Sequence, residues 1–310
     1  MNFFIRIHRQ LLTSFFLLLF VWGCAPSDKQ VAPSVLLRVA ILGDAEPKPE
    51  PLFPNLSAAV DQINQLAIEK PIHFAIGVGD IAHKATEIQY ENATPHLQRL
   101  TMPFYPIMGN EEHHGTVELF LKYANLWGNG KTSFDSPRYV VETPKVGFVF
   151  ASPDYSREFH DTGVTWISEE IKRMQPRPVF LIVHGAQVGV YPENAEKGIA
   201  NPTFASVIAH KNLVAVISGD LHMDMARVQH SKKMEHVHYL HIPALERTKI
   251  PDESNHTPMF RMLNIYTDGS VVVETYPVSD SLLPAAEFEY RFAIEPTIWS
   301  AVENTKASQE

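Results

Sequence analysis

The stretch HFAIGVGDIAH, residues 73–83, contains the pattern that decides the fold. Its apolar, β-branched run stops at Gly79-Asp80, which is typical of a buried parallel strand that places a carboxylate at its carboxyl end. Further runs end alike: VLLRVAILGD in Asp44, MPFYPIMGN in Asn110, VFLIVHG in His184, and LVAVISGDLH in Asp220 and His222. Ligands of open α/β sheets bind beyond the carboxyl ends of the strands, so these side chains are expected to form one metal site.

Helices are predicted between these strands, so strand, helix and strand alternate in both halves of the chain. Apolar residues recur at helical spacing from Asn55, the candidate N-cap, to Lys70. The other predicted helices are 86–100, 116–127, 164–174 and 202–210. A hairpin at 138–152 and strands at 237–244, 262–266 and 271–276 complete the pattern. We expect one α/β domain over residues 35–310.

Composition and charge limit the class of protein. The 310 residues have ordinary apolar and charged fractions, which fit one large α/β domain better than a disordered or fibrous chain. The formal net charge is −9, and such a chain repels phosphate backbones. Nucleic-acid binding is therefore not expected.

The first residues have the parts of a secretory signal peptide: Arg6 and Arg9, the apolar run LLTSFFLLLFVWG, and then Cys24. VWGC resembles the lipobox of bacterial lipoproteins. This implies a signal peptide at 1–23, diacylated Cys24 as the mature N-terminus and a lipidated linker at 24–34. It places the protein in the bacterial cell envelope, anchored to the membrane, with the periplasmic face of the outer membrane favoured by Ala25. An uncleaved anchor with an incidental cysteine is the alternative.

Each motif alone has a simpler explanation. An Asp or Asn between a strand and a helix is commonly a helix N-cap, and a single histidine such as His184 is commonly a hydrogen-bonded core residue. The repeated glycine before or after the polar residue favours a site, because glycine lets the backbone approach a ligand closely.

In order and position, these endings resemble the motifs of the calcineurin-like metallophosphoesterase superfamily: D-x-H, G-D-x-x, G-N-H, a lone H and G-H-x-H. The matching segments are Asp44-Ala45-Glu46, Gly79-Asp80, Gly109-Asn110-Glu111, His184 and Gly219-Asp220-Leu221-His222. The resemblance implies an αββα sandwich, two mixed β-sheets flanked by helices, that hydrolyses small phosphomonoesters or phosphodiesters with two metal ions. It implies that Asp80 bridges the metals. Asp44 and His222 would complete the first site, and Asn110, His184 and Asp220 the second.

Two departures from the family pattern replace imidazole with carboxylate. Glu46 stands where the first motif has histidine, and Asp220 stands where the last motif has its first histidine. Carboxylates favour Mn, Mg, Ca or Fe over Zn. A branch of bacterial alkaline phosphatases is similar in having G-D-x-H. His83, where purple acid phosphatases have a tyrosine ligand, is an alternative to Glu46 in the first metal site, or a surface residue.

A third departure concerns catalysis, because Glu111 replaces the G-N-H histidine that approaches the phosphate. An ionised carboxylate there repels phosphate unless it turns away. His113 and His114, in GNEEHHG, are candidates for the missing role, and solvated loop histidines are the alternative.

The sequence leaves three functions open. The first is a metal-dependent phosphoesterase. The second is a catalytically degenerate envelope lipoprotein that binds metal or a phosphorylated ligand, and the third is a structural lipoprotein without metal. Substrate identity depends on the rim, predicted at the proline-rich loop 47–54 and at 188–201. EHVHYLH places His236, His238 and His241 on a strand, which we interpret as half-exposed and outside the site.

Overall fold

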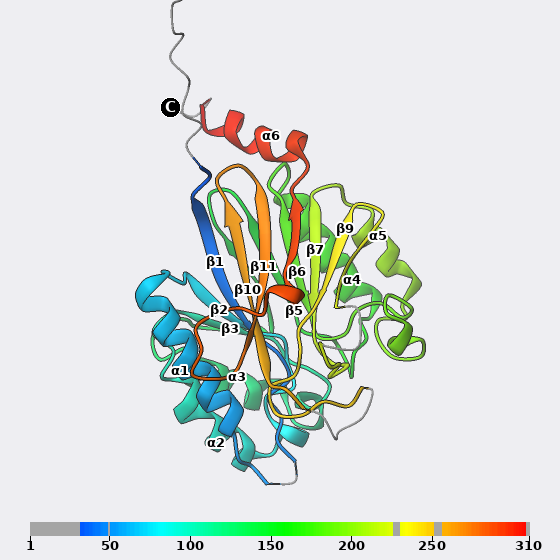
Figure 1. Ribbon diagram of the computed structural model, residues 1–310. Coiled ribbons are helices and arrows are strands. Elements are labelled where there is room, and N and C mark those ends of the chain that lie inside the picture. Colours follow the sequence, from blue (N-terminus) through cyan, green and yellow to red (C-terminus); the bar gives the residue numbers. More distant parts are fainter. Residues whose placement is uncertain (1–31, 49, 226–229, 251–255, 308–310) are drawn as a thin grey trace, which may run out of the picture. The chain divides into compact units, whose positions relative to one another are not determined.

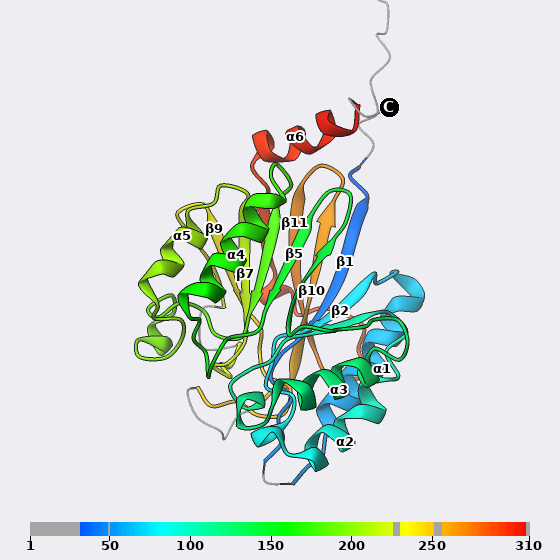
Figure 2. The ribbon, with the colours of Figure 1, turned by 180° about the vertical axis from the view of Figure 1, so that it is seen from behind.

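Two six-stranded β-sheets lie face to face in the computed structural model, and helices cover their outer faces (Figures 1 and 2). The structure describes residues 32–48, 50–225, 230–250 and 256–307. This architecture confirms the expected αββα sandwich with two mixed sheets. The predicted signal peptide and Cys24 lie outside the described residues.

The first sheet has the order β12-β11-β10-β1-β2-β3. Its parallel strands are β1 (Val35–Leu42), β2 (Phe74–Gly77) and β3 (Phe104–Pro106). Its antiparallel strands are β10 (Met259–Tyr266), β11 (Ser270–Pro277) and β12 (Tyr290–Ala293). The outer face is covered by α1 (Pro54–Glu69), α2 (Glu87–Leu97) and α3 (Val117–Trp127).

The second sheet has the order β4-β5-β6-β7-β9-β8. Four neighbouring strands are parallel: β5 (Gly147–Ala151), β6 (Val179–Val183), β7 (Leu213–Ser218) and β9 (Val237–His241). The antiparallel edges are β4 (Arg138–Glu142) and β8 (Ser231–Met234). The helices on this side are α4 (Asp161–Arg173) and α5 (Ala205–Ile208). A last helix, α6 (Pro296–Ala307), contributes Trp299 to the core between the sheets.

The inter-sheet core explains why the central strands are continuous apolar runs. Val39 and Ile76 of the first sheet pack with Phe148, Phe180 and Ile182 of the second. All five are fully buried. Because helices cover the other face of each sheet, successive residues of a strand are buried in opposite directions. Since the parallel strands run in one direction, their carboxyl ends lie at one end of the sandwich.

Two local predictions are wrong. Asn55 does not cap α1, because the helix begins at Pro54 with Phe53 as N-cap. Instead, Glu246 accepts hydrogen bonds from the backbone N–H groups of Asn55 and Leu56, at 3.1 and 3.0 Å. A residue distant in sequence therefore satisfies the helix start, which the local pattern does not reveal.

The strand that carries the histidines is buried throughout rather than half-exposed. His238 stacks on Phe292 of β12, with ring centroids 3.9 Å apart. His241 is fully buried, and its ring lies 5.8 Å from that of Tyr191. His236 lies before the strand begins, so the period-two interpretation fails there as well.

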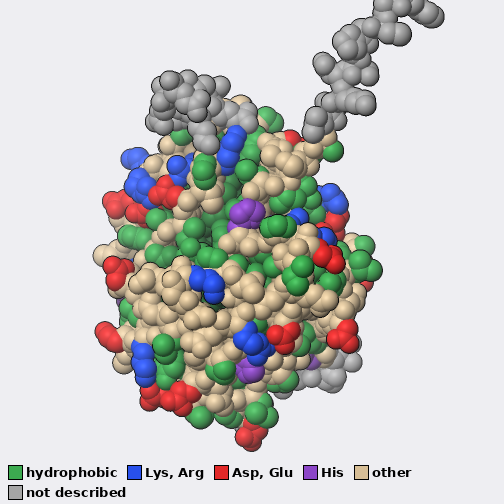
Figure 3. Space-filling view, turned by 90° about the vertical axis from the view of Figure 1, so that its left-hand side faces the viewer, with side chains coloured by type: hydrophobic (Ala, Val, Ile, Leu, Met, Phe, Trp, Pro, Cys, Tyr) green, Lys and Arg blue, Asp and Glu red, His purple; other side chains and the backbone are tan. Residues whose placement is uncertain are grey.

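Among the described residues, no helix is both long and apolar enough to cross a membrane. On the face shown in Figure 3, acidic and basic side chains are interspersed.

Candidate metal centre

The loops after β1 and β2 place Asp44 and Asp80 at the end of the sandwich where the parallel strands terminate. Asp80 has φ 51° and follows Gly79, whose φ is 96°. The turn therefore needs a backbone conformation that glycine adopts readily and that costs an aspartate free energy. A side chain on Gly109 would collide with the Asp80 carboxylate. Both glycines thus have a steric role at the site.

Glu112, which the sequence does not single out, fixes this turn. Its buried carboxylate accepts hydrogen bonds from four backbone N–H groups: Asp80 at 2.9 Å, Ile81 at 2.8 Å, Ala82 at 2.9 Å and Gly109 at 2.7 Å. The loops after β2 and β3 are therefore held together by one side chain. GNEEHHG contains two adjacent glutamates, and nothing in the local sequence distinguishes the one that points inward.

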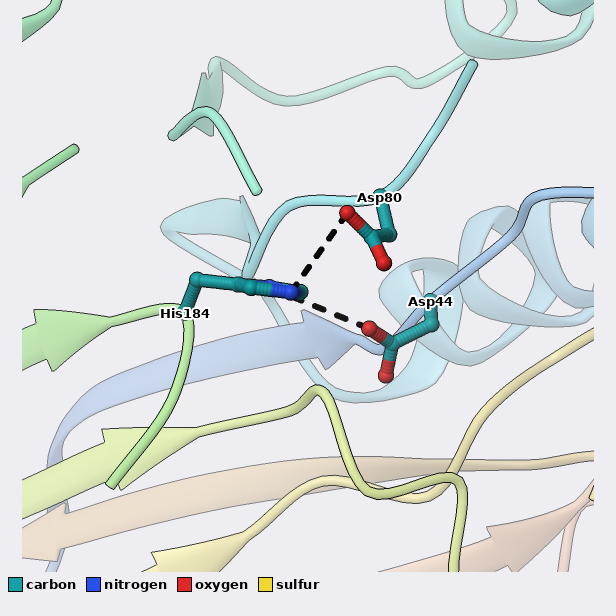
Figure 4. A group of neighbouring side chains, drawn as sticks. All are labelled: Asp44, Asp80 and His184. Carbon is teal, nitrogen blue, oxygen red and sulfur yellow. Dashed lines mark ion pairs between the residues drawn. The ribbon is translucent and has the colours of Figure 1, made fainter. Parts of the chain in front are cut away.

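Asp44, Asp80 and His184 point toward one another from the ends of β1, β2 and β6 (Figure 4). His184 Nε2 lies 3.4 Å from Asp80 Oδ1, and His184 Nδ1 lies 3.9 Å from Asp44 Oδ1. Their possible ligand atoms all fall within 4.8 Å of one another. A second such group contains Glu46, Asp80 and His222. Asp80 belongs to both groups, as a bridging ligand requires.

The hydrogen bonds of both histidines suit metal coordination. His184 Nδ1 lies 2.8 Å from the Val78 carbonyl, and His222 Nδ1 lies 2.9 Å from the Arg247 carbonyl. A carbonyl accepts only from N–H, so each Nε2 is left to bind a metal. His222 Nε2 and Asp80 Oδ2 are buried and have no hydrogen-bond partner in the described part of the chain. Two unpartnered ligand atoms in a carboxylate-rich site fit a bound cation.

Electrostatics show how charge is balanced without an ion. Burial raises the pKa of Asp44 to about 7. Burial works to lower the pKa of His184, but Asp80, Asp220 and Asp44 outweigh it and raise the pKa to about 10. Burial opposes ionisation of Asp80, yet His184 and the Glu111 N–H hold its pKa below the usual range. A metal ion would replace the His184 proton, so its binding would release a proton.

Asp220 is brought to the site but is held by an arginine. Arg157 Nε lies 2.7 and 2.6 Å from the two carboxylate oxygens, and Nη2 lies 2.6 Å from Oδ1. Asp220 Oδ1 is also 3.6 Å from His184 Nε2, and Asn110 Oδ1 is 3.3 Å from the same nitrogen. All four members of the second predicted ligand set are therefore linked through His184. Arg157 lies between β5 and α4, where no sequence motif marked it.

Glu46 is fully buried and surrounded by basic groups. Its carboxylate lies 3.1 Å from Lys48, 3.4 Å from Arg247, 3.5 Å from Lys249 and 2.9 Å from His83. Like Asp220, this carboxylate replaces a family histidine and is compensated by basic side chains of the chain itself. The sequence reveals the two substitutions but not these partners.

Glu111 turns toward His83 and the loop after β2. Its Oε2 lies 2.7 Å from His83 Nδ1 and accepts a hydrogen bond from the Lys84 N–H at 2.9 Å. Burial opposes ionisation, but the Lys84 N–H, Lys48 and His83 hold the pKa of Glu111 below its usual value. Glu46, His83 and Glu111 form a third group of possible ligands. Glu111 is thus an ionised carboxylate at the edge of the centre.

The two candidate replacement histidines differ in position. His114 is exposed. His113 is half-buried, and burial and the nearby His184 lower its pKa. Its Nε2 is buried and has no hydrogen-bond partner within the described ranges. Of the two histidines, only His113 has a pKa that is affected by the residues of the centre.

A pocket of about 400 Å³ opens beside Asp220. Arg157, Lys197 and Lys249 line it, with Glu193 and Glu196 from the same loop as Lys197. Four residues of the segment 188–201, which was predicted as part of the rim, therefore line a pocket beside Asp220. The basic side chains in this pocket can contact an anionic group placed against the carboxylates.

Comparisons with known proteins identify the family and agree with the fold. The family model for calcineurin-like phosphoesterase matches residues 37–224. The fold is similar to that of purple acid phosphatase PPD1 from yellow lupin (Lupinus luteus) seeds, with a TM-score of 0.60 and 13% identity over 86% of this chain and 55% of that one. This chain thus spans about half the length of the lupin enzyme. GAP50, the anchor in the inner membrane complex of Plasmodium, has a TM-score of 0.56 and 11% identity over 84% and 90% of the chains. No curated protein sequence matches.

Proposed function

Since the chain belongs to the calcineurin-like phosphoesterase family, we propose that it hydrolyses phosphate esters at two metal ions bridged by Asp80. The observation that carries the proposal is the pair of buried, unpartnered ligand atoms, Asp80 Oδ2 and His222 Nε2, among converging carboxylates. The family match supports a metal-dependent phosphoesterase in general terms. The dinuclear site and the small phosphate-ester substrate are our proposal.

The proposed ligands follow the contacts of the site. Asp44, Glu46 and His222 would hold the first ion with Asp80, while Asn110, His184 and Asp220 would hold the second with it. When bound, the ions would polarise the phosphoryl oxygen and lower the pKa of a coordinated water. The mainly carboxylate donors favour Mn, Fe, Mg or Ca over Zn.

The surrounding side chains would bind and orient the substrate. Arg157 fixes Asp220 and lines the pocket beside it, so its guanidinium can bind a phosphoryl oxygen. Lys249 likewise lines the pocket, and its Nζ lies 3.5 Å from a carboxylate oxygen of Glu46, so it can also bind a phosphoryl oxygen. Glu111 would not repel the phosphate strongly, because Lys48 lies 3.5 Å from its Oε1 and the Lys84 N–H and His83 hold its Oε2. His113 is the remaining candidate for the proton donor to the leaving group.

A panel of aryl, nucleotide and glycerol phosphates, assayed with Mn or Fe, tests the proposal. We expect hydrolysis that Asp80→Asn abolishes and that His113→Ala reduces, while His114→Ala, the exposed control, leaves it unchanged. Metal binding without turnover on the whole panel would overturn the catalytic proposal.

That last outcome would favour a second candidate, a degenerate envelope protein that binds metal or a phosphorylated ligand. The observation behind it is that Arg157 and the basic groups around Glu46 already compensate the two substituted carboxylates. Phosphate binding to a metal-loaded but inactive protein would support it.

We also propose that Cys24 is lipidated and that the protein faces the periplasm from the outer membrane. The motif VWGC after an apolar run supports this proposal. Mass spectrometry of the N-terminal peptide from bacterial envelopes should find a diacylglyceryl group on Cys24 and none in Cys24→Ala. A chain that still begins at Met1 would contradict the proposal.

A further inference from the structure

A buried arginine outside the metal centre has no counter-charge among the residues that the structure describes. Arg261, on β10, is fully buried. Its Nη1 donates to the His241 carbonyl at 3.0 Å, while Nε and Nη2 have no hydrogen-bond partner among residues the structure describes. The same described ranges contain no carboxylate that forms an ion pair with it. A buried, unpaired charge is strongly unfavourable, so a group that compensates it is expected.

Neutral polar rings surround this arginine. His241 is fully buried, and neither ring nitrogen has a partner in the described parts of the chain. The ring of His230 lies 5.4 Å from that of His241, and the ring of Tyr191 lies 5.8 Å from it. His230 Nε2 is occupied by the Asp224 carbonyl at 2.9 Å. The unpaired donors of this cluster thus come from Arg261 and His241.

The charge state of the cluster is one positive charge at neutral pH. Burial lowers the pKa of Arg261 to about 10, which leaves the guanidinium protonated. Burial lowers the pKa of His230 to about 4, and burial with His230 and Arg261 lowers that of His241 well below its usual value. Both histidines are therefore neutral, and a single negative charge would balance the cluster.

We propose that Arg261 and His241 bind a small monovalent anion of the halide kind inside the protein. Such an anion accepts from Arg261 Nε and Nη2 and from one ring N–H of His241, which satisfies the unpartnered donors and neutralises the guanidinium. A water molecule could accept the same hydrogen bonds but would leave the charge uncompensated. A pocket of about 280 Å³, lined by His230, Ser231 and Tyr290 together with Glu287 and Glu289, lies beside the His230 member of this cluster.

Crystals of the protein grown in bromide test the site directly. We expect an anomalous scattering peak at hydrogen-bond distance from Arg261 Nε or Nη2. A water molecule there, with no anomalous signal, would overturn the proposal.

Thermal unfolding in potassium bromide and in potassium gluconate at equal ionic strength tests it in solution. The wild-type melting temperature should rise with the logarithm of the bromide concentration, by roughly 3 °C at about tenfold excess over the dissociation constant. Arg261→Met should abolish the difference between the salts, and Arg291→Met, at an exposed ion pair with Glu289, should retain it. Equal wild-type melting temperatures in both salts would refute the site even if Arg261→Met does not fold.

Discussion

Replacing Glu112 with Gln should destabilise the protein strongly, although the side chain keeps its shape. In the structure each carboxylate oxygen accepts two backbone N–H groups: Oε2 from Asp80 and Gly109, and Oε1 from Ile81 and Ala82. The amide turns one acceptor into a donor, so two buried N–H groups lose their partner. At about 1–3 kcal/mol for each, the loss is about 2–6 kcal/mol. Relief of the repulsion between Glu112 and Asp80 brings the expected value into the lower half of that range.

Urea unfolding with EDTA present measures this loss without metal. The assay belongs at pH 8.5, because burial and Asp80 raise the pKa of Glu112 to about 7 and the carboxylate must be ionised. The control is Glu118→Gln, at an exposed glutamate six residues further along. It should change the free energy of unfolding by less than about 0.5 kcal/mol. A similarly small change in Glu112→Gln would refute the role of Glu112 in holding the Asp80 turn.

Three further predictions concern pH, phosphate and metal choice. Burial lowers the pKa of His238 to about 4. The neutral ring therefore stabilises the fold above pH 6.5. This contribution, at most about 3 kcal/mol, is lost as the pH falls from 6.5 toward 4. The difference in unfolding free energy between wild type and His238→Asn should therefore shrink in that window, and a constant difference would contradict the assignment. Arg157→Met should weaken the binding of inorganic phosphate to the Mn-loaded protein by about 10–100-fold, measured by calorimetry. Arg173→Met, on the surface of α4, is the control and should leave phosphate binding unchanged. Equal losses in both variants would argue against a specific contact between Arg157 and phosphate. Glu46→His should shift competition between Mn and Zn toward Zn, and an unchanged ratio would exclude Glu46 as a ligand.

The sequence predicts the sheets well wherever a strand lies in the inter-sheet core. The apolar parts of the runs VLLRVAILGD and VFLIVHG form β1 and β6, because both faces of a parallel strand are buried and its apolar run is continuous. Two strands and a helix were not predicted. β8 has the polar sequence SKKM at an exposed edge, β12 has only four residues, and α6 lies beyond the last predicted strand.

At the candidate centre, spacing predicts which residues meet but not what neutralises them. Asp44, Asp80 and His184 converge because the carboxyl ends of β1 and β2 in the first sheet and of β6 in the second lie at the same end of the sandwich. Arg157 binds Asp220 from a segment without a motif signal, and Glu112, next to the Gly109-Asn110-Glu111 match, is not distinguished from Glu111 by the local sequence. Their positions depend on long-range packing, so only the structure reveals them. For the same reason the burial of His238 and His241, covered by Phe292 and Tyr191, could not be read from period-two alternation.

Elemental analysis of the purified protein, reconstituted with Mn or Fe, measures whether the centre around Asp80 binds metal. We expect about two metal ions per chain in the wild type and a marked loss in Asp80→Asn, because the bridging carboxylate belongs to both ligand groups. Asp61→Asn, at an exposed carboxylate, serves as the control and should retain both ions. Absence of bound metal in the wild type, or equal metal content in wild type and Asp80→Asn, would contradict a metal centre built around Asp80.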